Sequence, residues 1–311
     1  MSITENRTLL QKADLALADL ASGGLLRAAQ ADQFIRLAIR KSVLMGMVTV
    51  SPMGSFQEDR DKTRFASRVM RSGTEATALP VALRSKPDLA RVTLDAKLFK
   101  AETRMSEEVL EDQIERGAFK DTVMQSLAAA IARDMESVAI NGDTVSGSAF
   151  LTPLDGILKQ ATANIVDGLS ARLNKTILKD VMKALDDEFA NLEGLQFWTN
   201  RQARVDYRDS LADRATPLGD AALTSSGTTQ YADIPITAVP EFPPTAETGG
   251  SVTQVLHTNG DNIVIGIYRK IKVEQQLDVP AGVLIVVSTL RWDVKILETS
   301  AAAKAINVLG T

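Results

Sequence analysis

The sequence has no cysteine and a single histidine, His257, among its 311 residues. Without cysteine the chain can form no disulfide, no cysteine-ligated zinc site and no thiol nucleophile. A single histidine makes a histidine-based metal site or a Ser-His-Asp triad unexpected, and although Asp261 follows His257 by four residues, no G-x-S-x-G motif is present. These absences remove several common catalytic chemistries, so we expect no catalytic, cofactor-binding or metal-binding residues.

The sequence also lacks a basic excess, an apolar leader and a long apolar run. Its formal net charge is -4 and its pI about 5.3, whereas nucleic-acid-binding proteins usually carry a basic excess. The N-terminus shows no basic segment followed by an apolar one. Apolar runs such as "VLIVV" fall far short of the ~18 residues that cross a bilayer. We therefore expect a soluble protein made in a cytoplasm, with no membrane partner.

A long amphipathic helix is the clearest pattern that is present. Over residues 118–140 large apolar residues recur every four positions, and we expect them to form the core-facing stripe of a spine helix: Phe119, Val123, Leu127, Ile131 and Met135. The helix should end at Asn141-Gly142, because both residues tolerate the left-handed conformation that closes many helices. No nucleophile, metal ligand or phosphate-binding loop follows this turn.

A charged segment separates two predicted strands, at 43–53 and 91–105. A structureless loop of this length is uncommon inside a compact domain, so we interpret the segment as an extended hairpin arm. Five basic residues alternate with acidic ones along it: Arg60, Lys62, Arg64, Arg68 and Arg71. Mixed charge suits a complementary protein surface, where it determines register and partner choice. A solvated surface loop is the alternative.

The remaining patterns predict further helices and strands in no regular order. Helices are expected at 1–22, 27–41, 174–191 and 200–214, and strands at 195–200, 233–243, 281–299 and 301–310. Asn259-Gly260 lies between two apolar runs and predicts a tight β-hairpin. Because strands and helices do not alternate as βαβ units, the fold class is α+β rather than a Rossmann fold or an α/β barrel.

The order of these parts resembles the major capsid proteins of tailed bacteriophages, which have the Hong Kong 97-like fold. The resemblance rests on three groups of residues at family spacing: Ser106, Glu108, Leu110, Glu111 and Asp112; Ala128, Ala132, Glu136, Ala139, Asn141, Gly142 and Asp143; Asp155, Gly156, Ile157 and Leu158. It extends over essentially the whole chain and is faintest between 190 and 260.

This resemblance implies a role for each part of the chain. Residues 1–42 would be an N-terminal arm and 43–103 an E-loop reaching over a neighbouring subunit, which makes the five basic residues of the arm candidate inter-subunit contacts. Residues 104–167 and 263–299 would form the P-domain, and residues 168–262 and 300–311 the A-domain.

The resemblance also implies a function and partners. The chain would assemble with itself into pentamers and hexamers of an icosahedral head shell that encloses phage double-stranded DNA without sequence-specific binding. Scaffold, portal and decoration proteins would be its further partners, and the virion, assembled in the host bacterial cytoplasm, its location. Some family members crosslink an E-loop lysine to an asparagine of another subunit. Lys62 and Lys86 are the available lysines here, but neither is assigned to that position and no crosslink is predicted.

Two alternatives remain open at this point. An encapsulin-type shell of a cellular nanocompartment would share the fold and package an enzyme. A metal-dependent hydrolase would use converging carboxylates, for which the acidic groups at 107–108, 111–112 and 186–188 are the candidates. Basic residues lie close to each group, so solvated helix faces also explain them.

Overall fold

The computed structural model describes residues 42–65, 68–73, 75–106, 119–212, 229–245, 248–268 and 272–310. The two helices predicted at 1–22 and 27–41, and almost all of the expected N-terminal arm, lie outside the described residues. The acidic groups at 107–108 and 111–112 lie outside them as well.

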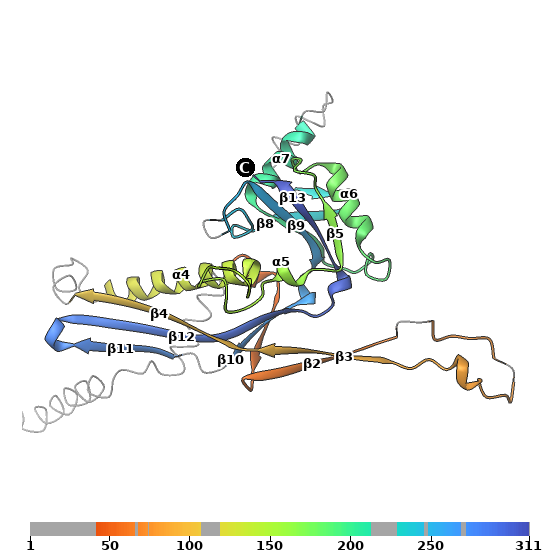
Figure 1. Ribbon diagram of the computed structural model, residues 1–311, viewed down its shortest axis with the longest axis horizontal. Helices are drawn as coiled ribbons and strands as arrows, with labels where there is room; N and C mark the ends of the chain where they lie inside the picture. The colour runs from red at the N-terminus through yellow and green to blue at the C-terminus, as the bar shows by residue number, and fades with distance from the viewer. Residues whose placement is uncertain are drawn as a thin grey trace, which may run out of the picture.

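A five-stranded sheet forms a long blade that points away from the rest of the molecule (Figure 1). The 14-residue strand β12 (Val283–Ile296) is its centre. One edge of β12 pairs antiparallel with β10 (Ile263–Tyr268) and β11 (Lys272–Asp278), and the other with β4 (Lys97–Ser106). Strand β1 (Thr49–Met53) adds in parallel to β10. A short 3-10 turn, η4 (Val279–Ala281), joins β11 to β12 at the tip of the blade.

The helix α4 (Phe119–Asn141) lies along this sheet, close to its predicted bounds. Ala128 and Ala132 are fully buried on its inner side, and these small side chains let the helix axis approach the strands closely. Met135 is also buried, and Leu127 and Ile131 are half-buried against the core. The side chains of Phe119 and Val123 lie outside the described part of the helix.

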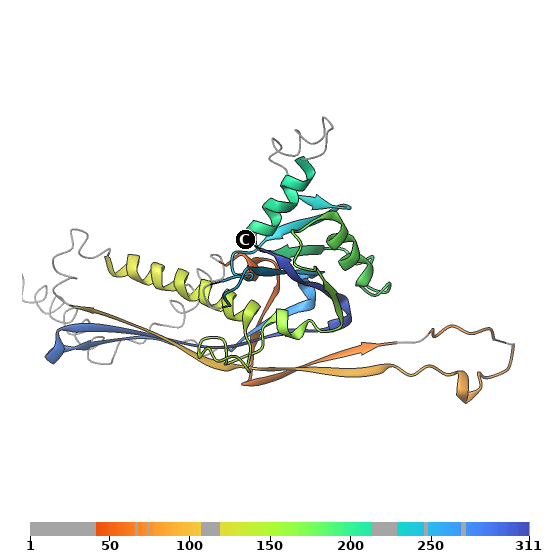
Figure 2. The same ribbon diagram turned by 45° about the horizontal axis from the view of Figure 1, so that its top comes forward.

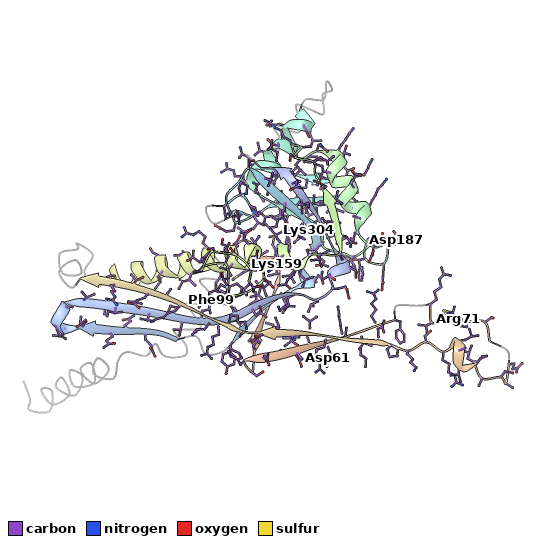
Figure 3. The ribbon with its side chains drawn as sticks, in the orientation of Figure 1. Asp61, Arg71, Phe99, Lys159, Asp187 and Lys304 are labelled. Carbon is purple, nitrogen blue, oxygen red and sulfur yellow. The ribbon has the colours of Figure 1, made fainter. Side chains whose placement is uncertain are left out.

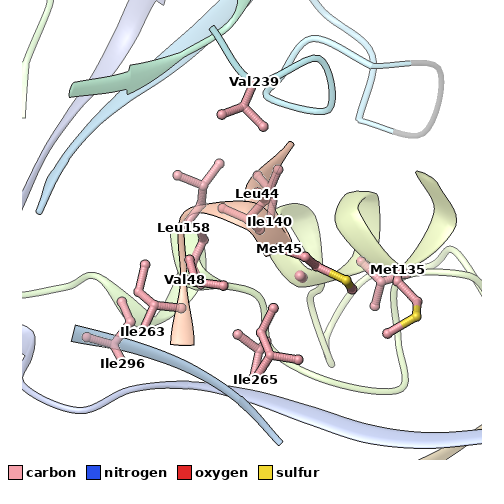
Figure 4. Close-up of a cluster of buried hydrophobic side chains, with 14 of the residues drawn as sticks. Leu44, Met45, Val48, Met135, Ile140, Leu158, Val239, Ile263, Ile265 and Ile296 are labelled. Atoms are coloured by element: carbon pink, nitrogen blue, oxygen red, sulfur yellow. The ribbon is translucent and has the colours of Figure 1, made fainter. Parts of the chain in front are cut away.

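The largest core cluster fills the space where α4 ends and the two sheets of the body approach each other (Figure 4). Residues just before β1 contribute to it, because the 3-10 turn η1 (Leu44–Gly46) buries Leu44 and Met45 beside Met135 and Ile140. Burying a side chain of this kind stabilises the fold by about 1.5–3 kcal/mol. The chain is therefore fastened to the spine helix at the point where its described part begins.

A six-stranded sheet forms the upper body, in the order β5-β13-β9-β6-β8-β7. Its strands are β5 (Asn164–Asp167), β13 (Ala302–Leu309), β9 (Val252–Asn259), β6 (Leu195–Thr199), β8 (Ile234–Ala238) and β7 (Gln230–Tyr231). The helices α6 (Lys175–Ala184) and α7 (Arg201–Ala212) pack on it with a second apolar core. The short helix α5 (Ile157–Gln160) connects α4 to β5. Strand β5 was expected to belong with the spine helix, whereas its pairing with β13 joins it to this sheet.

The helix predicted over 174–191 is shorter in the structure. Asn174 caps its start by accepting the backbone N–H groups of Thr176 and Ile177, but α6 ends at Ala184. Leu185 turns to extended backbone and remains buried, which directs the chain out of the helix.

The hairpin predicted at Asn259-Gly260 is wrong. Strand β9 belongs to the six-stranded sheet and β10 to the five-stranded sheet, so the turn η3 (Gly260–Asn262) is a crossover between them. Glycine is needed because a Cβ at position 260 would lie 1.9 Å from the carbonyl oxygen of Met47. The Asn259 side chain accepts the Asp261 N–H at 2.9 Å, which shapes the turn.

A second crossover lies beside the first. Strand β12 continues through Glu298 and the 3-10 turn η5 (Thr299–Ala301) into β13 of the other sheet. Asn262 ties the two crossovers together, since its Nδ2 donates to the Glu298 carbonyl at 2.9 Å and its Oδ1 accepts the Glu298 N–H at 2.8 Å. The two sheets are thus connected at one place by two bonded chain segments.

The charged segment forms a two-stranded ribbon that projects from the opposite end of the molecule to the blade (Figures 1 and 2). Strands β2 (Gln57–Arg64) and β3 (Asp88–Asp95) pair antiparallel in full register. The predicted hairpin arm is present, but β2 forms its first strand in place of residues 43–53, and the second predicted strand divides at Ala96 into β3 and β4. Beyond the ribbon, the outer arm (residues 65–87) carries the short 3-10 turn η2 (Val81–Leu83).

Candidate functional site

The arm is rooted firmly in the five-stranded sheet. The buried carboxylate of Asp293 on β12 accepts the Asp95 backbone N–H at 2.8 Å, where β3 passes into β4. Burial raises the pKa of Asp293, although this hydrogen bond opposes the change. Leu94 is fully buried against Met53 and Val264. These contacts make the inner end of the ribbon a rigid continuation of the sheet.

Three of the five predicted basic residues contact their own chain. Lys62 Nζ donates to the Leu297 carbonyl at 2.7 Å and lies 2.9 Å from Glu298 Oε2. The Arg64 guanidinium lies 3.7 Å from both Glu298 and Glu188. Arg60 pairs with Glu58 at 2.8 Å and donates to Ser51.

Glu298 is the acceptor that joins the ribbon to the upper body. Partial burial would raise the pKa of its carboxyl, but the bonds from Lys62 and Ser300 outweigh burial and the pKa is lowered. The charged form of Glu298 is thus the one that the fold stabilises. Glu298 was not among the predicted site residues, since nothing in the sequence brings position 298 next to position 62.

The outer arm exposes both charge and apolar surface. Arg68 and Arg71 are exposed there (Figure 3). Exposed large apolar side chains accompany them: Phe65, Val69, Met70, Leu79, Val81 and Leu83. Met70 is 91% exposed, more than any other large apolar residue that the structure describes. Several exposed apolar side chains on one projecting segment indicate an interaction surface.

The Asn-Gly-Asp-Thr turn after α4 is a packing junction. Gly142 donates to the Val138 carbonyl at 2.9 Å and accepts from the Gly156 N–H at 2.8 Å. A Cβ at Gly142 would lie 2.5 Å from the Leu154 carbonyl oxygen, and one at Gly156 would lie 2.5 Å from that of Ile140. The two glycines let the segment before α5 cross directly over the end of the spine helix.

An ion cluster closes this junction. Lys159 Nζ lies 2.6 Å from Asp143 Oδ1 and 2.7 Å from Asp155 Oδ1, and the Thr144 N–H donates to Asp155 at 2.9 Å. The hydrogen bond that Lys159 donates to Asp143 changes both groups: it lowers the pKa of the Asp143 carboxyl and raises the pKa of the Lys159 ammonium. Charges that stabilise each other in this way favour a structural role over nucleophilic chemistry. The spacing of Asp155 and Lys159, four residues apart, was a signal visible in the sequence.

Buried polar residues elsewhere are used in packing. His257 lies in β9 with its ring stacked on Phe197 at 4.3 Å, and its Nδ1 lies 3.2 Å from the Gln196 carbonyl. Burial lowers its pKa to about 4. Lys304 donates to the Leu158 carbonyl at 2.7 Å, and burial lowers its pKa as well. Glu136 of α4 accepts from Ser42 Oγ at 2.5 Å and from the Val43 N–H at 2.8 Å.

The acidic groups considered for a hydrolase site do not gather in the part of the chain that the structure describes. Asp186, Asp187 and Glu188 are exposed after α6, and Glu188 lies 3.7 Å from Arg64 at the outer end of β2; Asp187 is labelled in Figure 3. Within the described residues no three or more histidine, cysteine, aspartate or glutamate side chains are grouped so as to hold a metal ion. No helix in the described ranges is both long and apolar enough to span a membrane.

Comparison with known proteins identifies the family. A profile of the phage capsid family matches residues 22–305. The chain belongs to this family. It is 32% identical over 308 residues to the putative prophage capsid protein YqbE of Bacillus subtilis strain 168, a match that covers 97% of this chain and 99% of that protein. As a capsid protein the chain is a structural subunit of the phage head shell.

Solved capsid structures share the fold at low sequence identity. The capsid of a native GTA particle matches with a TM-score of 0.63 and 15% identity, over 86% of this chain and 90% of that one. The procapsid of satellite phage P4 with its size determination protein matches with a TM-score of 0.64 and 11% identity, over 99% and 98% of the two chains. The mixed α+β architecture is therefore that of a capsid subunit.

The SrpI encapsulin of Synechococcus elongatus PCC 7942 also matches, with a TM-score of 0.58 and 10% identity over 86% of this chain and 88% of that chain. At this identity the likeness extends to the fold alone. The encapsulin alternative thus has less support than the phage capsid interpretation. The latter is supported by the family match and by a relative that aligns over nearly the full length of both chains.

Proposed function

We propose that this capsid protein assembles as a Hong Kong 97-like subunit into pentamers and hexamers of an icosahedral head shell. Residues 1–42 act as the N-terminal arm and 43–103 as the E-loop. Residues 104–167 and 263–299 act as the P-domain, with α4 as its spine, and residues 168–262 and 300–311 as the A-domain. The pairing of β5 (Asn164–Asp167) with β13 supports counting this strand with the A-domain instead of the P-domain.

The observation that supports this proposal most is the position of the arm. The ribbon projects from one end of the subunit and the blade from the other (Figures 1 and 2). A subunit with two different contact surfaces at opposite ends makes head-to-tail contacts, and such contacts close into rings when the rotation between copies permits it. Rings of five and six copies are the units from which a closed shell is built.

The shell acts through contacts rather than catalysis, and it encloses double-stranded DNA without reading its sequence. Scaffold, portal and decoration proteins are the further partners that we propose, with assembly in the host bacterial cytoplasm. The family membership and the prophage relative support this role. The mixed charges of the arm and the net charge of -4 suit protein contacts better than a groove for nucleic acid.

Electron microscopy and light scattering of the purified protein test the proposal. We expect capsomer rings or closed particles, with the scaffold and portal proteins co-expressed if the chain alone stays monomeric. Deleting residues 68–87 leaves the ribbon strands β2 and β3 in place and should abolish assembly. Particles that form equally well without residues 68–87 would show that the E-loop assignment is wrong. An enzyme copurifying inside the particles would favour the encapsulin alternative.

A further inference from the structure

We propose that the outer arm of one copy inserts Met70 and its neighbours into an apolar cavity between α4, β4 and β12 of the next copy. This inference rests on the proposed function and specifies which surface receives the arm. The cavity has a volume of about 170 Å³ and is lined by Phe99, Ile131, Met135, Phe150, Leu290 and Trp292. A cavity of ~150 Å³ can hold a molecule of the size of benzene, so one methionine side chain finds room here.

One residue of the cavity lining carries an unsatisfied hydrogen-bond donor that is covered by its own chain. Trp292 is fully buried and stacks on Phe99 with ring centroids 5.3 Å apart. Its Nε1 has no hydrogen-bond partner among the described residues. Buried N–H groups are normally bonded, because leaving one unpaired costs free energy. What the cavity offers an occupant is its apolar and aromatic lining, which an apolar side chain would match.

The outer arm has that chemistry. Residues 68–73 form neither helix nor strand. Met70 is almost fully exposed, and Val69 beside it is half-exposed. A methionine side chain adapts to an irregular cavity, and its sulfur makes favourable contacts with aromatic rings. Phe99, Phe150 and Trp292 supply such rings.

The arm and the cavity of one chain cannot meet. The cavity lies under α4, where Phe99 is labelled in Figure 3, whereas the arm extends from the opposite side of the molecule. Both views show this separation (Figures 1 and 2). An arm that fills this cavity must therefore belong to a second copy, and the same contact can repeat around a ring.

The absence of cysteine allows a direct test by disulfide mapping. Lys100 lines the mouth of the cavity with its side chain 58% exposed, so Lys100→Cys should not disturb the fold. The double variant Met70→Cys/Lys100→Cys is assembled and oxidised. We expect a ladder of crosslinked oligomers on denaturing gels. The matched control is Met70→Cys/Lys179→Cys, with the second cysteine exposed on α6, and it should give no ladder.

A double-mutant cycle gives an independent measurement of the same contact. Ser288→Ile narrows the cavity from a buried position, and Met70→Ser removes the inserted side chain. Each variant should lower the thermal stability of assembled particles, and the double variant should lose no more than the worse single one, because both remove one contact. Circular dichroism of the monomers checks that each variant folds.

The outcomes separate this inference from the proposed function. Particles with a ladder only in the Lys100 variant, and non-additive losses, support the cavity as the seat of the arm. If particles form but show no crosslinked ladder, and the losses of thermal stability are additive, the cavity is not the binding site of the arm, and the shell function is unaffected. A wild-type chain that forms no particles even with scaffold and portal proteins overturns both.

Discussion

Lys62 and Glu298 are 236 positions apart in the chain, yet Lys62 Nζ lies 2.9 Å from Glu298 Oε2. This pair joins the outer half of the ribbon to the crossover between β12 and β13. Both side chains are partly exposed, at 34% and 23%, so solvent screens their attraction. The contact is therefore suited to orienting the arm rather than to stabilising the fold.

Lys62→Met should change the orientation of the arm more than the stability of the chain. We expect the free energy of unfolding to fall by less than about 1 kcal/mol, as for other partly exposed ion pairs. Hydrogen exchange of the β2 and β3 amides should become faster, because the ribbon loses its bond to the upper body. Lys100→Met, which breaks an exposed pair with Glu102 on β4, is the control and should leave that exchange unchanged. A larger loss of stability would contradict an orienting role.

Acid should weaken the same contact. The folded pKa of Glu298 is lowered from its ordinary value of 4.5, so the stability that its charge contributes is present above pH 4.5. That contribution is lost as the pH falls through the folded pKa. Other carboxylates titrate in the same range, so the informative quantity is the difference between wild type and Glu298→Gln. Thermal unfolding from about pH 5 to 3 should show a shallower pH dependence in the variant. Identical slopes would exclude a contribution from Glu298.

The single histidine should titrate far below its ordinary pKa. Burial lowers the folded pKa of His257 from 6.5 to about 4, so its neutral form is favoured in the fold. The stability that follows from this preference is fully present above pH 6.5. It is lost progressively as the pH falls from 6.5 to about 4, and the loss in the free energy of unfolding then amounts to roughly 3 kcal/mol. One imidazole proton resonance in the NMR spectrum reports this titration directly. A midpoint near 6.5 in the folded chain would show that His257 is solvated.

Adding one methyl group at the end of the spine helix should be costly. In Gly142→Ala the new Cβ would lie 2.5 Å from the Leu154 carbonyl oxygen, so the backbone must shift. We expect a loss of about 1–3 kcal/mol in the free energy of unfolding, measured with urea. Gly147→Ala is the matched control, because none of the described atoms lies within 4 Å of its Cβ position. An equal effect of the two substitutions would mean that backbone entropy, and not packing, decides the result.

The helix and the long strand were predictable because apolar periodicity is a local property. The repeat of Leu127, Ile131 and Met135 predicted α4, and the apolar run at 283–287 predicted β12. Strand β2 has no such signal, since all eight of its residues from Gln57 to Arg64 are charged or polar. The strand is held by its backbone pairing and by cross-strand ion pairs such as that of Arg91 with Asp59, which a single sequence does not reveal.

The contacts that organise the arm and the crossovers were not predictable for a related reason. Asn259-Gly260 fulfils the rule for a tight hairpin, but the space at Gly260 is set by the carbonyl of Met47, more than two hundred positions earlier. Asp293 and Glu298 likewise acquire their roles only when distant strands meet them. Local rules describe which turn a dipeptide permits, and tertiary packing decides which one is used.

The doubled crossover at Asn262 and Glu298 has a mechanical consequence. Two chain segments that run side by side and are bonded to each other resist twisting more than a single linker would, and allow bending mainly about one axis. Lys62 of the ribbon forms an ion pair with Glu298 at this joint between the two sheets. A force that a neighbouring subunit exerts on the arm is therefore transmitted first to this joint. Glu298 then links that force to the angle between the two sheets.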